Sequence, residues 1–163
     1  MDSQDVTYEL DISRIFGVPP PTVYRAFVEP CLLAAWFPRS GWSMPPQQAE
    51  IDPRPGGRLR YVLVSTHEPA GHVVRSAVFS HAQEDRLLAW TLESAPGSSA
   101  GTSGGAAPAH TVEVELVPEP HRTTRLELRE GPFTEAAEID ARECWNAAFG
   151  RLDRVLADVT LVS

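Results

Sequence analysis

Apolar and polar residues alternate along several short stretches of the chain, which is the pattern of half-buried β-strands. The first stretch covers residues 6–16, where Val6, Tyr8, Leu10 and Ile12 alternate with polar residues. In the stretches at 111–117 and 125–130 the apolar face is expected to pack inward and the polar face to meet solvent. The stretches at 71–79 and 87–92 carry apolar residues on both faces, which suggests that they are covered on more than one side. These further strands are expected at residues 49–52, 58–65, 71–79, 87–92, 111–117 and 125–130.

A different spacing predicts helices at both ends of the chain. Prolines 19–21 end the first strand and suit a helix start near Thr22, while Glu29 and Pro30 separate that helix from a second one over residues 31–37. Residues 135–159 contain no proline, and apolar residues recur there at three- and four-residue steps. The stripe consists of Ile139, Trp145, Phe149, Leu152, Leu156 and Val159.

The order of these elements predicts an α+β fold. A curved antiparallel sheet is expected to wrap around the long C-terminal helix, with two short helices after the first strand, because the helix stripe needs an apolar partner. A single domain over residues 1–163 is expected, with its core at about residues 6–159. Residues 94–109 contain only serine, alanine, proline, glycine and threonine, which predicts a flexible loop within a hairpin.

Charge and composition exclude several classes of function. The formal net charge is −8, every one of the 14 lysine or arginine positions holds arginine, and no basic stripe is present, so nucleic-acid binding is not expected. No apolar stretch is long enough to cross a bilayer, which argues against membrane insertion. The acidic first residues lack the features of a signal peptide, so a cytoplasmic location is expected.

The chain contains no recognisable catalytic or metal-binding motif. Cys31 and Cys144 lie far apart and are expected to fill small apolar gaps rather than form a redox or zinc pair. His67 and His72 flank an expected turn, and His81, His110 and His121 also fall near expected turns, so all five are interpreted as solvated loop histidines. No catalytic residue, metal ligand or cofactor is therefore predicted.

Several segments are similar to one known family. They are residues 18–27, residues 29–37, residues 52–60 with their Pro-Gly-Gly turn, and residues 85–90, followed by Trp145, Phe149 and Leu152 in the last helix. In order and spacing they resemble the START-like (SRPBCC) superfamily, in the branch similar to the C-terminal domain of the heat-shock-protein-90 ATPase activator. The resemblance implies a helix-grip fold with a cavity between the sheet and the last helix, and a rim altered by the insertion at residues 94–109.

Such a cavity would be lined by apolar and aromatic side chains with a few polar groups. Trp42 is the candidate gate because glycine and proline flank it, whereas for Trp36 and Trp90 a place in the core is favoured over a place in the cavity lining. Arg60 and Arg75 are candidate partners for a ligand carboxylate, and a solvated position on the convex face is their alternative. The full set of candidate ligand-binding residues is Trp36, Phe37, Trp42, Tyr61, Arg60, Arg75, Trp90, Trp145 and Phe149.

Three functions remain open from the sequence. Members of the superfamily bind lipids, sterols or polyketides, so the resemblance implies a carrier or sensor of a small hydrophobic molecule. The alternatives are a protein-interaction or chaperone-regulator module and a cyclase- or aromatase-type enzyme, the enzyme being less favoured because no catalytic constellation is visible. A cavity with a wholly apolar lining would favour a carrier. A polar cluster deep in the cavity would favour an enzyme. A filled core would favour the interaction module. An exposed apolar patch would favour either that module or a homodimer.

Overall fold

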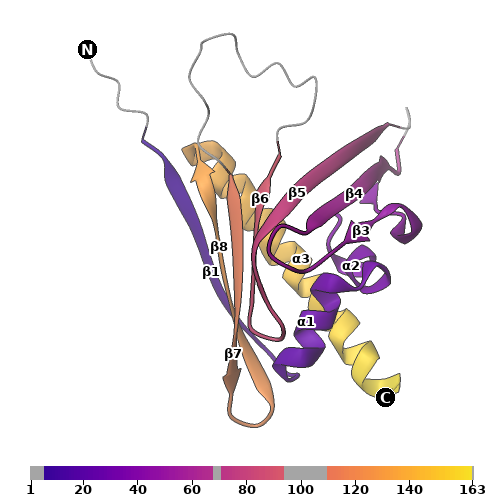
Figure 1. The fold of residues 1–163 in the computed structure, drawn as a ribbon, viewed down its shortest axis with the longest axis vertical. Helices are drawn as coiled ribbons and strands as arrows, with labels where there is room; N and C mark the ends of the chain where they lie inside the picture. Colours follow the sequence, from indigo (N-terminus) through magenta and orange to yellow (C-terminus); the bar gives the residue numbers. More distant parts are fainter. Residues whose placement is uncertain (1–5, 68–70, 94–109, 163) are drawn as a thin grey trace.

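The computed structural model describes residues 6–67, 71–93 and 110–162, and its strands form one curved antiparallel sheet (Figure 1). The strand order is β1-β8-β7-β6-β5-β4-β2, and β3 pairs with β4. The long helix α3 crosses one face of the sheet, and α1 and α2 pack beside it. The elements are β1 (Tyr8–Phe16), α1 (Pro20–Val28), α2 (Pro30–Trp36), β2 (Trp42–Ser43), the 3₁₀ turn η1 (Pro46–Gln48), β3 (Glu50–Ile51), β4 (Arg58–Ser65), β5 (His72–Gln83), β6 (Leu87–Leu92), β7 (Thr111–Glu119), β8 (Thr123–Phe133) and α3 (Glu135–Val162).

The predicted α+β helix-grip fold is confirmed, with two short helices after the first strand and a long helix on the sheet. Three strands are longer than predicted, because backbone pairing continues past the last alternating apolar residue: β5 reaches Gln83, β7 reaches Glu119 and β8 reaches Phe133. His81 therefore lies within β5 and not at a turn. The loop expected at residues 94–109 lies outside the described residues.

The core forms where the inner face of the sheet meets the helices. Strand alternation places every second side chain on that face, and the helices supply the opposite wall. The buried inner-face residues are Leu10, Ile12, Leu59, Tyr61, Ala77, Phe79, Leu88, Trp90, Val112, Val114, Leu116, Leu126 and Leu128.

The two short helices are held in place by polar contacts as well as by packing. Glu29 adopts an extended backbone (φ −94°, ψ 120°), the conformation favoured before Pro30, and so it separates α1 from α2. Trp36 Nε1 donates a hydrogen bond to the Ala26 carbonyl at 3.0 Å, which joins the helices. Arg151 of α3 donates to the carbonyls of Trp36 (3.0 Å) and Pro38 (2.9 Å), and so caps the end of α2.

The structure also corrects the predictions for Ile139 and Cys31. Ile139 was expected in the buried stripe of α3, yet it is 53 % exposed, because the buried stripe begins one turn and a half later at Trp145 and continues through Ala148, Phe149, Leu152 and Leu156. Cys31 was expected to fill an apolar gap, yet it is exposed at the start of α2. Within the described part of the chain, no helix combines the length and apolar character needed to span a membrane.

Candidate functional site

A small apolar cavity lies between the two short helices and the central strands. Its volume is about 10 Å³, roughly the space that one water molecule needs. The core is therefore almost filled, and any larger guest must displace side chains. The cavity is lined by Phe27 of α1, Leu33 of α2 and Phe37 just beyond it, Leu59 and Tyr61 of β4, Phe79 of β5, and Leu88 and Trp90 of β6.

Tyr61 is the polar member of this lining. The residue is 7 % exposed, and its ring packs edge-on against Phe37 at a centroid distance of 5.4 Å. No other described residue forms a hydrogen bond with its hydroxyl. Burial raises the pKa of Tyr61 to about 12, Arg75 opposes that rise, and Glu130 adds to it. The phenol therefore remains protonated at neutral pH and offers a hydrogen-bond donor to the cavity.

Arg75 stands next to Tyr61 on the same face of the sheet. The two residues are direct partners in the β4–β5 ladder, so their side chains project to the same side. Arg75 is exposed, which places it at the solvent edge of the inner face, while Tyr61 lies deeper. Its guanidinium forms no ion pair with any residue that the structure describes.

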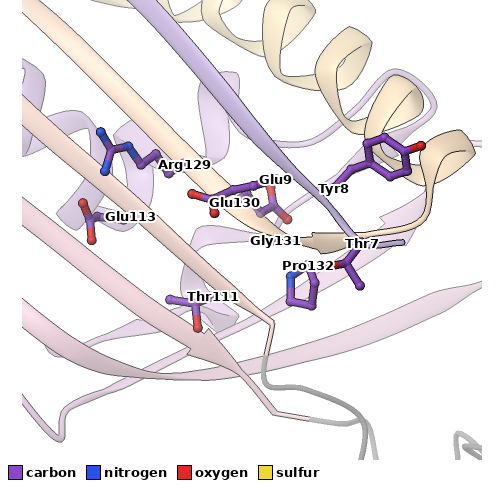
Figure 2. Close-up of a pocket in the computed structure, with 9 residues that line it drawn as sticks. All are labelled: Thr7, Tyr8, Glu9, Thr111, Glu113, Arg129, Glu130, Gly131 and Pro132. Atoms are coloured by element: carbon purple, nitrogen blue, oxygen red, sulfur yellow. The ribbon is translucent and has the colours of Figure 1, made fainter. Parts of the chain in front are cut away.

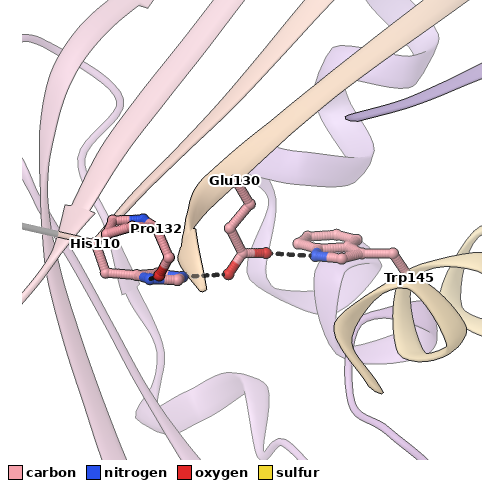
Figure 3. A network of polar contacts seen from close by, with 4 residues as sticks. All are labelled: His110, Glu130, Pro132 and Trp145. Atoms are coloured by element: carbon pink, nitrogen blue, oxygen red, sulfur yellow. Dashed lines mark hydrogen bonds and ion pairs between the residues drawn. The ribbon is translucent and has the colours of Figure 1, made fainter. Parts of the chain in front are cut away.

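Glu130 of β8 forms the centre of a polar network beside the cavity, between His110 and Trp145 (Figure 3). Its side chain is 11 % exposed. One carboxylate oxygen accepts a hydrogen bond from Trp145 Nε1 at 2.6 Å, and the other lies 2.6 Å from His110 Nε2. His110 Nδ1 lies 3.2 Å from the Pro132 carbonyl. Both oxygens of Glu130 are therefore engaged, and the network joins β8 to α3.

His110 is held between an acceptor on each side, unlike the solvated loop histidine expected from the sequence. The hydrogen bond to Glu130 raises the pKa of His110. Partial burial opposes this rise, while the negative charge of Glu130 and the Pro132 carbonyl add to it. In the protonated form both ring nitrogens donate, which matches the two acceptors that face them.

This network predicts a pH-dependent contribution to stability. The pKa of His110 in the folded protein lies above the ordinary value of 6.5, so its stabilising effect is complete below about pH 6.5 and is lost as the pH rises through the folded pKa. Glu130→Gln should therefore cost more free energy of unfolding at about pH 6 than at about pH 9. Urea unfolding at both pH values and an NMR titration of the His110 ring would measure this. His72→Gln, at an exposed position on β5, is the control, and equal losses for Glu130→Gln at both pH values would contradict the assignment.

The structure brings most of the sequence-predicted site residues together. Phe37, Tyr61 and Trp90 line the cavity, and Arg75 lies beside Tyr61. Trp145 touches the cavity wall through Phe37, with ring centroids 5.9 Å apart. Trp36 and Phe149 stack on each other behind this wall, with centroids 6.3 Å apart, and both are fully buried core residues.

Two of the predicted residues lie elsewhere. Trp42 was expected to gate the cavity, but its strand β2 pairs with the far end of β4, and Trp42 borders a separate surface hollow of about 310 Å³ next to α2 and Arg151. Arg60 was a candidate partner for a ligand, with the convex face as its alternative. It alternates with Leu59 and Tyr61 and so lies on the outer face. There it borders a hollow of about 490 Å³ that also contains Val62, Val64 and Val74.

Another hollow, of about 430 Å³, lies over the ends of β1, β7 and β8 (Figure 2). Arg129 and Glu113 are partners across the β7–β8 ladder and belong to its rim, together with Glu9. The hollow is shallow and mixes both signs of charge, so it offers a ligand neither enclosure nor a uniform field. Across the described ranges, no group of three or more His, Cys, Asp and Glu side chains is arranged to hold a metal ion.

Glu130 and His110 were missed in the sequence. A signal for Glu130 was present, because Leu126, Leu128 and Glu130 share one face of β8, and that face is the buried one. A charged residue that continues an inward stripe is expected to have a partner. No comparable signal exists for His110, because its contact with Glu130 depends on the register of β7 against β8.

Comparison with known proteins agrees with this fold. The family model "Activator of Hsp90 ATPase homolog 1-like protein" matches residues 17–157. A protein from Nitrosomonas europaea has a similar structure, with a TM-score of 0.74 and 24 % identity over 99 % of each chain. So does a protein of unknown function from Staphylococcus aureus, with a TM-score of 0.75 and 16 % identity over 98 % of this chain and 99 % of the other.

An AHSA1-like protein from Aeromonas hydrophila is also similar, with a TM-score of 0.71 and 15 % identity over 93 % of this chain and 95 % of the other. At these identities the solved structures establish the fold alone. Among curated proteins, none matches the sequence. The family model covers far more than half of the chain, and the fold agrees with it. The chain therefore belongs to the family of Activator of Hsp90 ATPase homolog 1-like proteins, within the START-like superfamily.

Proposed function

We propose that this protein binds a small, largely apolar molecule in an enlarged form of the Tyr61 cavity, as a carrier or sensor. The observation that carries the proposal is the Tyr61 hydroxyl, which forms no hydrogen bond with any described residue although it belongs to a largely buried side chain that lines an otherwise apolar cavity. Phenylalanine would fill nearly the same space without a hydrogen-bonding group, so a hydroxyl that no described residue uses supports a role in recognising a guest.

Binding requires the cavity to open, because its volume of about 10 Å³ holds no ligand larger than water. One wall consists of Phe27, Leu33 and Phe37, which belong to α1, α2 and the residue that follows α2. Phe37 is only partly buried, and α2 is a helix of 7 residues between Pro30 and Pro38. We therefore place the opening at Phe37. Its ring contacts Tyr61 and Trp145, so its displacement would enlarge the cavity toward Trp145.

The hydrogen bonds of the Glu130 network favour a carrier over an enzyme. A general acid or base must reach the reacting group of a substrate. Both oxygens of Glu130 are already engaged by Trp145 and His110, and the cavity lining itself contains Tyr61 as its polar residue. This arrangement supports a site that holds a molecule and not one that transforms it.

The protein-interaction reading is the second candidate, and the small volume of the cavity favours it. A core that is filled before any ligand arrives is what a module working through its surface would have. The name of the matching family refers to an activator of the Hsp90 ATPase, which also supports a protein partner. The two readings differ in one respect: only the carrier must take up apolar molecules at the Tyr61 cavity.

Uptake of the neutral fluorophore N-phenyl-1-naphthylamine tests the proposal. We expect saturable fluorescence enhancement with the unmodified protein and several-fold tighter binding to Phe37→Ala, because that change removes the side chain that must otherwise move. Trp42→Ala is the matched control, an aromatic truncation at the surface hollow, and should leave the affinity unchanged. Absence of binding by all three proteins would favour the interaction module. An affinity that is insensitive to Phe37→Ala, or changed equally by Trp42→Ala, would move the site away from this cavity.

A further inference from the structure

Two polar side chains, one in the lining of the Tyr61 cavity and one beside it, have hydrogen-bond donors that no described residue uses. Tyr61 offers its O–H, and Arg75 offers its guanidinium; neither has a hydrogen-bond or ion-pair partner among the described residues. The nearby acceptor, the Glu130 carboxylate, already has one partner on each oxygen, Trp145 on one and His110 on the other. A guest that brings an acceptor can therefore use both of these donors.

The two donors are placed to act on one group. Tyr61 and Arg75 are direct cross-strand partners, and such partners have Cβ atoms roughly 4.5–5.5 Å apart. Tyr61 is buried and Arg75 is exposed, so Tyr61 lies nearer the cavity and Arg75 lies nearer solvent. Burial keeps the pKa of Tyr61 near 12, so its hydroxyl stays a donor even beside a bound anion.

We infer that the guest is an amphiphilic monocarboxylate, whose carboxylate is bound by Arg75 and Tyr61 while its apolar body occupies the opened cavity. This inference rests on the proposed function. A guanidinium matches the planar carboxylate with two parallel hydrogen bonds. A single arginine suits one negative charge, and the negative charge of Glu130, which also acts on Tyr61, disfavours a phosphate dianion. The remaining lining is aliphatic or aromatic, which suits a hydrocarbon body.

Displacement of N-phenyl-1-naphthylamine by decanoate and by decan-1-ol tests the inference, because the two compounds have chains of equal length and differ at the head group. We expect decanoate to bind the unmodified protein about tenfold more tightly than decan-1-ol. Arg75→Met should abolish this preference, while the affinities for decan-1-ol and for the fluorophore stay unchanged. Arg60→Met is the matched control, since Arg60 lies on the outer face of the adjacent strand, and it should keep the preference.

Tyr61→Phe provides a second and independent readout. It should weaken decanoate several-fold, because the carboxylate loses a donor, while stability in the absence of ligand does not fall. A clear loss of stability combined with unchanged decanoate affinity would show that the hydroxyl is structural and overturn its part in recognition.

The failures of the two proposals are distinguishable. If the fluorophore does not bind at all, the proposed function itself fails. If the fluorophore binds but decanoate and decan-1-ol displace it equally, the cavity binds apolar molecules without recognising a carboxylate. That result would contradict only the present inference. If Arg60→Met and Arg75→Met reduce the preference equally, the effect is one of overall charge, which also overturns the assignment to Arg75.

Discussion

Replacing Trp36 by alanine is expected to lower the free energy of unfolding by about 3–5 kcal/mol. The residue is fully buried, and its indole meets Phe27 and Phe37 edge-on at centroid distances of 4.9 and 5.6 Å. It also stacks on Phe149 of α3 at 6.3 Å. The indole N–H donates to the Ala26 carbonyl, so the substitution also leaves that buried acceptor unpaired. Trp36 thus joins α1, α2 and α3.

Trp42 provides the matched control for this prediction, because it is another tryptophan of the same chain but borders a surface hollow. Trp42→Ala should cost less than about 1 kcal/mol, as surface substitutions usually do. Urea unfolding of both variants with a common m-value would make the comparison. Equal losses for the two tryptophans would contradict the placement of Trp36 at the junction of the helices.

Replacing Gly57 by alanine is expected to cost about 3 kcal/mol or more, because backbone must move to admit one methyl group. A Cβ at this position would lie 2.0 Å from the Asp52 carbonyl oxygen and 2.9 Å from the Arg54 carbonyl oxygen. The 52–57 turn is also docked on β5, since Gly56 N–H donates to the Phe79 carbonyl at 2.8 Å and Phe79 N–H donates to the Gly57 carbonyl at 2.9 Å. Opening the turn therefore disturbs Phe79, a residue of the cavity lining.

Gly150 is the control glycine for this prediction. It lies within α3, and a Cβ there meets nothing within 4 Å. Gly150→Ala should raise stability by about 0.4–1 kcal/mol, because alanine favours the helix and restricts the unfolded chain. Thermal and urea unfolding of both variants would test the contrast. A Gly57→Ala protein as stable as the unmodified chain would mean that the turn is not as tight as described.

Much of the fold could be predicted because strand and helix periodicities differ. The bounds of β4 (Arg58–Ser65) and β6 (Leu87–Leu92) agree with the prediction, since turn residues flank two strongly apolar stretches. The ends of β5, β7 and β8 could not be predicted, because there the strands carry polar residues and proline and are held by backbone pairing with neighbours. That pairing depends on tertiary structure and leaves no local pattern.

The site was only partly predictable for a related reason. Alternation along β4 and β5 places Tyr61 and Arg75 on one face and Arg60 on the other, so their separation could have been derived from the sequence. The volume of the cavity could not, because it depends on how α1 and α2 pack against the sheet. The position of Trp42 was equally hidden, since its two-residue strand is defined by pairing with Val64 and Ser65.

The most direct test of the central claim is to locate a bound apolar molecule by NMR. Intermolecular nuclear Overhauser effects would be recorded between decan-1-ol and the isotope-labelled protein. An alcohol is used because its binding does not depend on the inferred carboxylate contact. Binding in the opened cavity predicts contacts from the alkyl chain to the rings of Tyr61, Phe79 and Trp90. Contacts confined to Trp42 or to the outer-face residues Val62 and Val74, or none at saturating decan-1-ol, would contradict the claim that this cavity takes up a ligand.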